Sequence, residues 1–363
     1  MTYLDYQATT PLAPEALAAM LPLLEGNFAN PHSTHAQGRA ARAAVEVARD
    51  DVAALFPPGG TVSFTGGATE ALNWAIKGAS GGIVTIATEH AAVLDTVEAE
   101  RRRGREAVVL PVGPEGLVDL AAARAAIRPG IGLVAAMLVN NEIGVIQPIE
   151  ELAHLAHAAG ALFLCDAVQG YGRVRMPDGC DLIAVSAHKI HGPKGVGALW
   201  IRDGVALAPL LHGGGQEPAG RSGTLSPALC AGFGAAARLA KQRFGVDHAH
   251  AEQLFRAALA RVPGDWVLNG AQADRYPGNL NLRHDGLDVA RLMSDLRDIA
   301  FSAGSACASG SGRPSHVLRA LGLSDAQARA SIRIGFGRYT TEDALLHAID
   351  RIVAAARRQS RAA

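Results

Sequence analysis

The stretch LIAVSAHKIHGPKGVGALWI, residues 182–201, places a lysine between two histidines where an apolar run ends. A solvated lysine normally lies on a helix face among other charges. Lys189 instead follows the apolar run and precedes a Gly-Pro loop, after which a second apolar run begins. This arrangement predicts a lysine that is held at the end of a buried strand and directed into a site.

Short apolar runs alternate with Ala-rich helical segments along the chain. The runs predicted as strands are TVSF, GIVTIAT, AVVLPV, GLVAAMLV, ALFLCDAV, LIAVSAH and VGALWI. Apolar strands interleaved with helices are typical of a mostly parallel sheet with both faces covered. We therefore expect an α/β fold with a large domain over residues 13–245. Because the pattern changes near residue 246, we expect residues 1–12 and 246–363 to form a smaller α+β domain.

The charges of the chain balance, since 34 Lys and Arg residues face 34 Asp and Glu residues. No net field would therefore attract nucleic acid or an anionic membrane. The opening MTYLDYQATT lacks a basic segment followed by an apolar one, and no apolar run approaches the roughly 18 residues of a membrane span. We expect a cytoplasmic protein with a small substrate, and neither a nucleic-acid nor a membrane partner.

The cysteines at positions 165, 180, 230 and 307 are widely and unequally spaced. Such spacing fits neither a disulfide framework nor a paired zinc site, so reduced thiols are expected. Cys165 lies in an apolar run and is predicted to be buried. Cys307 lies in FSAGSACASGSGRPS, residues 301–315, among Gly and Ser. These surroundings fit both a cysteine that is exposed incidentally on a loop and a cysteine that has a function.

Polar residues follow the predicted strands, and ligands bind beyond the carboxyl ends of strands in an open parallel sheet. After TVSF, the segment TGGATEALNWAIKG opens a helix whose free N–H groups suit a phosphate. The other strands are followed by Glu89 and His90, by Asn140, Asn141 and Glu142, by Asp166 and Gln169, and by Ser186, His188 and Lys189. An anion cradle, an aspartate, a histidine and a lysine are thus expected at one sheet edge.

This combination suits pyridoxal 5'-phosphate. A lysine amine forms a Schiff base with it, an aspartate keeps its pyridine nitrogen protonated, a helix N-terminus holds its phosphate, and a flat side chain covers its ring. Single members have simpler explanations, because an aspartate after a strand often caps a helix and a histidine is often structural. Their joint placement favours the cofactor.

Nine segments in order along the chain resemble those of the cysteine desulfurases of the class V aminotransferase family, in the group with a long loop around the catalytic cysteine. The segments are YLDYQATTP, FTGGATEALNWAIKG, TEHAAVLDT, VNNEIGVIQPI, DAVQGYGR, SAHKIHGPKGVGALWI, HGGGQEPAGRSGTL, SAGSACASGSGRPSHVLRALGL and SIRIGFGRYTTED. They extend from the first residues to about Asp343. The resemblance implies the type I fold of pyridoxal-phosphate-dependent transferases, and conversion of L-cysteine to L-alanine with transfer of sulfur to an enzyme cysteine as a persulfide.

The resemblance also implies roles for single residues. Lys189 matches the Schiff-base lysine, Asp166 the partner of the pyridine nitrogen, Gln169 the neighbour of the ring hydroxyl, and His90 the residue on the ring face. Ala68, Thr69, Ser186 and His188 match the phosphate site, while Thr224 matches a residue that reaches the phosphate across a homodimer interface. Asn141 lies near the cofactor and, with Arg333, near the substrate carboxylate, for which a guanidinium is the natural partner. Cys307 matches the sulfur-accepting nucleophile.

Two departures from the family pattern are mild: Gly66 stands where many relatives have Ser, and Ala187 replaces a Gly. Little sequence follows Asp343, so we expect no C-terminal extension of the kind through which some relatives dock a scaffold protein. A sulfur-acceptor or scaffold protein is an expected partner. Iron-sulfur cluster assembly, tRNA thiolation and DNA sulfur modification are the pathways that remain open.

Two other classes of function remain alternatives. A selenocysteine lyase or another class V transaminase would use the same lysine and aspartate, with less need for a loop cysteine. A non-catalytic scaffold would not require Lys189, Asp166 and Cys307 together. No metal site is expected, because His154 and His157, the best-spaced pair, have no third ligand nearby.

Overall fold

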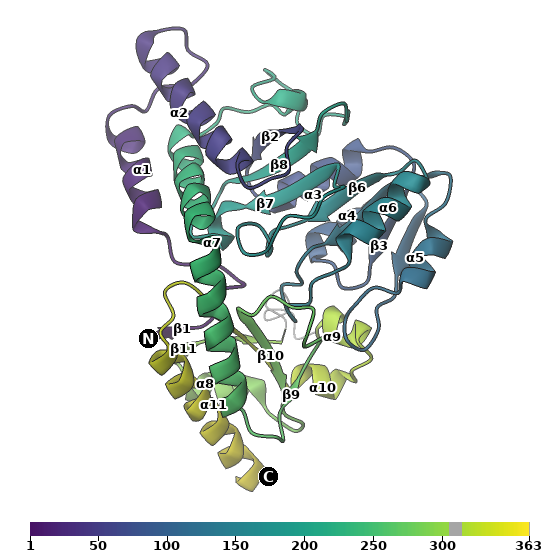
Figure 1. Ribbon diagram of the computed structural model, residues 1–363, viewed down its shortest axis with the longest axis vertical. Helices are drawn as coiled ribbons and strands as arrows, with labels where there is room; N and C mark the ends of the chain where they lie inside the picture. Colours follow the sequence, from purple (N-terminus) through teal and green to yellow (C-terminus); the bar gives the residue numbers. More distant parts are fainter. Residues whose placement is uncertain (305–313, 363) are drawn as a thin grey trace.

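The structure, a computed structural model, describes residues 1–304 and 314–362, with side chains to residue 359. It contains a seven-stranded sheet, a four-stranded sheet and a two-stranded pair, flanked by helices (Figure 1). The strands are β1 (Thr2–Tyr3), β2 (Gly60–Thr65), β3 (Gly82–Ile86), β4 (Ala107–Leu110), β5 (Ile131–Met137), β6 (Leu162–Asp166), β7 (Leu182–Ser186), β8 (Gly197–Arg202), β9 (Val267–Leu268), β10 (Asn279–Arg283), β11 (Ile299–Ala300), β12 (Ser302–Ala303) and β13 (Ser331–Gly335). The helices are α1 (Pro14–Glu25), α2 (Ala36–Ala53), α3 (Ala68–Gly78), α4 (Ala91–Arg102), α5 (Leu120–Ala126), α6 (Ile149–Ala158), α7 (Pro227–Arg261), α8 (Val289–Asp295), α9 (His316–Ala320), α10 (Asp325–Arg329) and α11 (Glu342–Ala362).

The seven-stranded sheet has the order β2-β8-β7-β6-β5-β3-β4, and each of the seven apolar runs supplies one strand. All pairings are parallel except those of β8, which runs antiparallel to both β2 and β7. The connection from β7 to β8, residues 187–196, is too short for a crossover helix, so the chain turns back. The prediction of a mostly parallel α/β sheet is confirmed.

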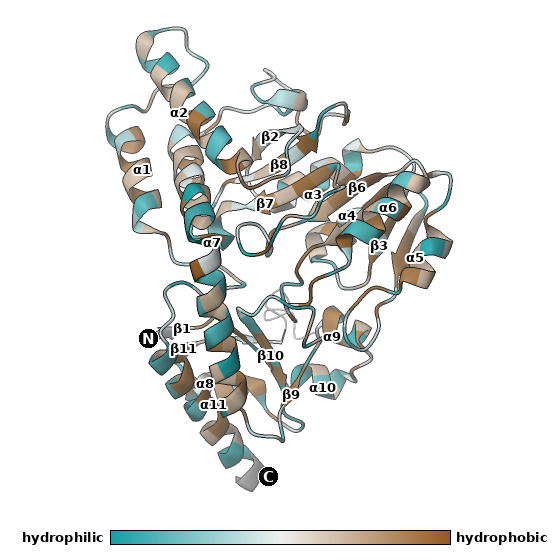
Figure 2. Cartoon of the chain, in the orientation of Figure 1, coloured by the Kyte–Doolittle hydropathy of each residue, from teal (hydrophilic) through white to brown (hydrophobic). Residues whose placement is uncertain are grey.

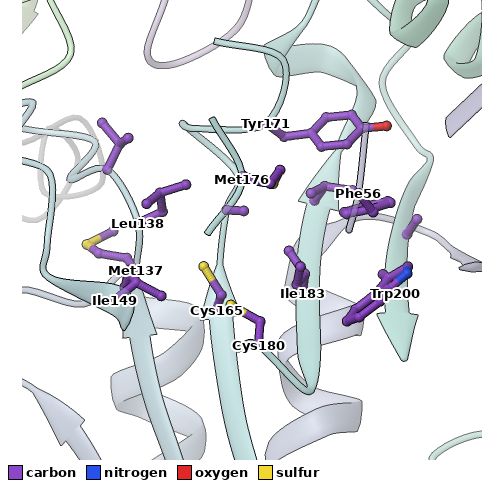
Figure 3. Close-up of a cluster of buried hydrophobic side chains, with 14 of the residues drawn as sticks. Phe56, Met137, Leu138, Ile149, Cys165, Tyr171, Met176, Cys180, Ile183 and Trp200 are labelled. Carbon is purple, nitrogen blue, oxygen red and sulfur yellow. The ribbon is translucent and has the colours of Figure 1, made fainter. Parts of the chain in front are cut away.

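Alternate residues of the central strands serve opposite faces of the sheet. Val134, Phe163 and Ile183 belong to the core against α2, α6 and α7, while Leu133 and Leu164 belong to the core against α3 and α4. Apolar residues therefore fill these strands, which Figure 2 shows as mostly brown. Figure 3 shows side chains of the first core, with the sulfurs of Cys165 and Cys180 close together. The prediction that Cys165 is buried is confirmed, since its exposure is 0%.

A separate core lies under the four-stranded sheet, which has the order β12-β13-β10-β9. It joins strand residues such as Leu280 and Ile332 with residues of α8, α11 and the second half of α7. Leu4 from the N-terminus also belongs to this core. The turn-rich segment NGAQADRYPGNLNL, residues 269–282, leads into the strand β10.

Helix α7 links the two cores, because Phe233 packs in the large core and Leu254 in the small one. The boundary expected at residues 245 and 246 lies inside this continuous 35-residue helix. The division into residues 13–245 against 1–12 and 246–363 remains our proposal. Across residues 1–304 and 314–362, no helix combines the length and apolarity that crossing a membrane requires.

Replacing Gly197 with Ala should destabilise the protein. A Cβ on this first residue of β8 would lie 2.5 Å from the Val185 carbonyl oxygen and 2.8 Å from the Cα of Gly67, at the start of α3. Both neighbours are backbone, so relief requires movement of the strand or of the helix start. We expect G197A to lower the free energy of unfolding by about 1–3 kcal/mol in urea denaturation.

The matched control is G245A. Gly245 lies within α7, and a Cβ there would meet nothing within 4 Å. Because Ala favours a helix over Gly by up to about 1 kcal/mol, G245A should be at least as stable as the wild type. Equal stability of G197A and G245A would contradict the steric argument.

Candidate active site

A cavity of about 840 Å³ opens at the carboxyl edge of the central sheet. Residues that follow β2, β3, β6 and β7 line it, as the sequence predicts. The predicted site residues in its wall are Ala68, Thr69, His90, Asn141, Asp166, Gln169, Ser186, His188, Lys189 and Arg333. One cavity thus brings together predicted residues from positions 68 to 189 and Arg333 of β13.

Lys189 is the last residue of a short 3-10 turn, Ala187–Lys189, which follows β7. Its Nζ donates to the carbonyl oxygens of Gln7, at 2.6 Å, and Ala8, at 2.8 Å. Thr10 fixes the same turn, since its backbone N–H and its hydroxyl both donate to the His188 carbonyl oxygen. The N-terminal segment therefore holds the lysine in the cavity.

Asp166 lies at the end of β6 with an exposure of 4%. Burial raises the pKa of its carboxyl, while the Val168 N–H at 3.0 Å, His90 and Lys189 oppose this increase. A buried carboxylate among such partners can hold a proton on a ring nitrogen. Gln169, three residues on, is also buried and donates from Nε2 to the Gln7 carbonyl oxygen at 2.9 Å.

His90 is the N-cap of α4, and its Nδ1 accepts the Ala92 N–H at 3.1 Å. Burial lowers the pKa of its imidazole, with Lys189 and His316 acting in the same direction and Asp166 opposing them. A neutral imidazole that accepts at Nδ1 carries its proton on Nε2. The lowered pKa therefore keeps the His90 ring neutral at pH 7, with its Nε2–H as a hydrogen-bond donor.

His188 and Ser186 form part of the wall near the start of α3. Burial lowers the pKa of His188 to about 4, and Lys189, Lys194 and Arg173 add to the effect. The His188 ring is thus neutral at pH 7, and its Nδ1 lies 3.1 Å from the Thr9 hydroxyl. It can hydrogen-bond to an anion without adding a second charge beside Lys189.

The N-terminus of α3 has the features of a phosphate cradle. Gly67 is its N-cap, with φ +154°, and no side chain caps the helix. The first free N–H groups of the helix therefore face the cavity with Thr69. Glu70 lies in the same turn, where Arg221 neutralises it through a 2.8 Å ion pair.

Arg333 is 1% exposed in β13. It donates to Asp5 Oδ1 at 2.7 Å and to the Asn141 carbonyl oxygen at 3.0 Å, while its buried Nε has no partner in the described part of the chain. Sequence reasoning missed Asp5 as the counter-ion. The only available signal was its place in YLDYQATTP, because the pairing joins residues 328 positions apart.

Glu142 is a buried carboxyl beside this arginine. Its Oε2 accepts a hydrogen bond from the Ser315 hydroxyl at 2.5 Å, and its exposure is 2%. Burial raises the pKa of Glu142 to about 7, although Ser315 and Arg333 both favour the ionised form. This carboxyl therefore titrates near neutral pH.

Among the predicted site residues that the structure describes, Thr224 does not line this cavity. Thr224 is exposed and lines a separate groove with Leu24 and Phe28. Cys307 lies outside the described residues. No group of three metal-ligating side chains occurs among the described residues, and His157 instead contacts Asp181 at 2.7 Å.

Comparison with known proteins gives a consistent result. A model of the class V aminotransferase family matches residues 2–346. The chain belongs to this family. It is 43% identical to a probable mitochondrial cysteine desulfurase of Schizosaccharomyces pombe, over 96% of this chain and 73% of that protein. It is 42% identical to the cysteine desulfurase IscS of Rickettsia bellii, over 96% of this chain and 89% of that protein.

A solved structure titled as a NifS-like protein matches the fold with a TM-score of 0.89 and 30% identity, covering 97% of this chain and 99% of that one. The expected pyridoxal-phosphate-dependent transferase fold is therefore confirmed. Pyridoxal phosphate is the cofactor of class V aminotransferases, and the cavity of this member has the groups that the cofactor requires.

The unfolding free energy of E142Q should diverge from that of the wild type as pH rises. Because the folded pKa of Glu142, about 7, exceeds the ordinary value of 4.5, the folded state binds more protons than the unfolded state between these values. Stability therefore falls with rising pH in this window, and Gln lacks this loss. Urea denaturation should show a relative gain for E142Q of up to about 3 kcal/mol by pH 7.

The control is E150Q, which removes an exposed carboxyl from the first turn of α6. Its unfolding curves should follow those of the wild type across the same pH range. Parallel behaviour of E142Q and the wild type would show that Glu142 is ionised throughout.

Proposed function

We propose that the protein is a cysteine desulfurase, which converts L-cysteine to L-alanine and transfers the sulfur to Cys307. The observation that carries the proposal is the presence of Lys189, Asp166 and Arg333 in one cavity with the uncapped N-terminus of α3. The names of the relatives described above agree with this activity. In the reaction the carbon–sulfur bond of cysteine breaks, and a sulfur–sulfur bond to the Cys307 thiolate forms.

The cavity fits pyridoxal phosphate by the chemistry of its groups. When bound, the cofactor supplies an aldehyde that condenses with amines and a ring that accepts electrons. The Lys189 amine anchors it and then moves the substrate Cα proton. Asp166 keeps the ring nitrogen protonated, His90 covers the ring and relays a proton, and the N-terminus of α3 holds the phosphate.

Arg333 and Asn141 are proposed to bind the substrate carboxylate. A guanidinium matches a carboxylate with two parallel hydrogen bonds. The Nε of Arg333 is buried without a partner in the described chain, while Asp5 and the Asn141 carbonyl oxygen hold the terminal nitrogens. The arginine is thus held in place with a donor still available.

The residues on either side of the Cys307 segment are fastened close to Arg333. The Gly304 N–H donates to the Ser331 carbonyl oxygen at 2.8 Å, and Ser315 donates to Glu142. Ser302, before this segment, lies 3.3 Å from Arg333 Nη2. These anchors support a role for Cys307 next to the substrate site.

Cys307→Ser tests the proposal. Because a hydroxyl is a far weaker nucleophile toward sulfur than a thiolate, alanine production from cysteine should be almost completely lost. Cofactor binding depends on other residues, so borohydride reduction should attach the cofactor to the Lys189 peptide in both proteins. Mass spectrometry of the trapped persulfide should identify Cys307 in the wild type.

Two outcomes would overturn the assignment. Near-normal alanine production by C307S would favour a lyase that releases its chalcogen without a protein nucleophile. A persulfide on one of the buried cysteines, or borohydride labelling of another lysine, would show that the nucleophile or the anchoring lysine is misassigned.

A symmetric dimer is the proposed working state, with Thr224 contributing to the phosphate site of the other subunit. Thr224 is exposed beside Leu24 and Phe28, which are 56% and 77% exposed. Leu17 and Leu21 extend this apolar face along α1. Such a face on an otherwise well-packed chain suits burial against a second copy.

Light scattering of the wild type should give twice the 37.5 kDa chain mass. The double variant L24K/F28K should be monomeric and retain the cofactor poorly. V47K, which charges an exposed valine of α2, is the control and should remain dimeric. A fully active monomeric wild type would exclude the dimer proposal.

The persulfide sulfur is proposed to pass to an acceptor protein, as in iron-sulfur cluster biogenesis or another thiolation pathway. The cytoplasm is the proposed location. The described cysteines, Cys165, Cys180 and Cys230, are all free and buried, which agrees with a reducing compartment.

A further inference from the structure

The side chain of Arg173 contacts the backbone of Lys189. Arg173 belongs to the turn that follows β6, and its Nη1 donates to Gln169 Oε1 at 2.8 Å. Its Nη2 donates to the Lys189 carbonyl oxygen. The guanidinium carbon lies 5.4 Å from the ring centroid of Tyr276. Both hydrogen bonds therefore reach residues of the cavity wall.

No carboxylate offsets the charge of Arg173 within the described residues. Burial lowers its pKa, Arg338 acts in the same direction, and the opposing groups are Tyr276 and Tyr6. A partly buried cation without an ion pair depends on the neutral oxygens that it can reach. For Arg173 these oxygens belong to Gln169 and Lys189.

A guanidinium can only donate hydrogen bonds, so it determines which end of the Gln169 amide faces it. Oε1 of Gln169 points to Arg173, which turns Nε2 toward the other side. Nε2 donates one N–H to the Gln7 carbonyl oxygen at 2.9 Å, and that same oxygen accepts from Lys189 Nζ. The second N–H of the amide is left for a group in the cavity that Gln169 lines.

We infer that Arg173 is a positioning residue, which holds the Gln169 amide as a hydrogen-bond donor toward the ring oxygen of the cofactor and fixes the backbone of Lys189. The inference rests on the proposed function, because it requires pyridoxal phosphate in this cavity. Without Arg173, only the contact with the Gln7 carbonyl oxygen still favours this orientation of the Gln169 amide. The amide is then held less firmly as a donor toward the ring oxygen.

The visible spectrum of the loaded protein tests the inference. A donor at the ring oxygen favours the bound form in which that oxygen is ionised, which absorbs at the longer wavelength. In R173M the ratio of long- to short-wavelength absorbance should fall several-fold, and the dissociation constant of pyridoxal phosphate should rise about tenfold. R173K keeps the charge but loses the planar guanidinium. Its absorbance ratio and its dissociation constant should lie between those of R173M and the wild type.

A double-mutant cycle separates an action through Gln169 from general damage. Q169L removes the amide and leaves Arg173 only its contact with the Lys189 carbonyl oxygen. Adding R173M to Q169L should therefore change the absorbance ratio much less than R173M changes it in the wild type. R175M is the matched control, because Arg175 lies two residues away on the same segment with its side chain 86% exposed. It should match the wild type in spectrum and affinity.

The outcomes distinguish the two proposals. A wild type that acquires no visible absorbance with pyridoxal phosphate would defeat the proposed function itself. A normal wild type with an unchanged spectrum in R173M and R173K would overturn only the inference. A full additional effect of R173M in the Q169L background would also overturn it, since Arg173 would then act by another route.

Discussion

The contact of the Lys189 ammonium with the carbonyl oxygens of Gln7 and Ala8 is the interaction on which the site depends. A lysine can remain inside a cavity only when its charge is met by polar groups. Those groups come from the N-terminal segment, 182 and 181 residues away from Lys189. Leu4, just before them, is buried in the small core, so both cores must be assembled before the lysine is held.

The charged groups of the cavity compensate one another in the same way. His90 and Lys189 favour the ionised form of Asp166 and so lower its pKa, and Arg333 forms an ion pair with Asp5. Removing one member of a buried pair leaves the other uncompensated, which is costly. The site is therefore a network in which a single substitution should affect several neighbours, and single-variant data alone will not apportion its energy.

The sequence was sufficient for the central sheet, because continuous apolar runs such as that of residues 182–187 specify buried parallel strands. It was also sufficient to place residues at or just beyond a strand end, such as Asp166 and Lys189, at this edge of the sheet. It could not reveal Asp5 as the counter-ion of Arg333, or the contact of Arg173 with Gln169, because these depend on which segments meet in space. The short strands β10 and β13 were equally hidden, since turn residues precede the first of them.

The loop that leads to Thr224 shows how the phosphate cradle is tied to more distant parts of the chain. Glu217, whose side chain is fully buried, forms a bidentate pair with Arg49 and accepts the Phe64 N–H of β2. Four residues later, Arg221 pairs with Glu70, which itself accepts the Gly66 N–H beside the cradle. The loop is thus fastened to α2 by one ion pair, to β2 by a backbone hydrogen bond, and to the start of α3 by a second ion pair. Arg221 and Glu70 therefore link the Thr224 segment to the Gly66 N–H, and so connect the phosphate cradle with the face that is proposed to meet a second subunit.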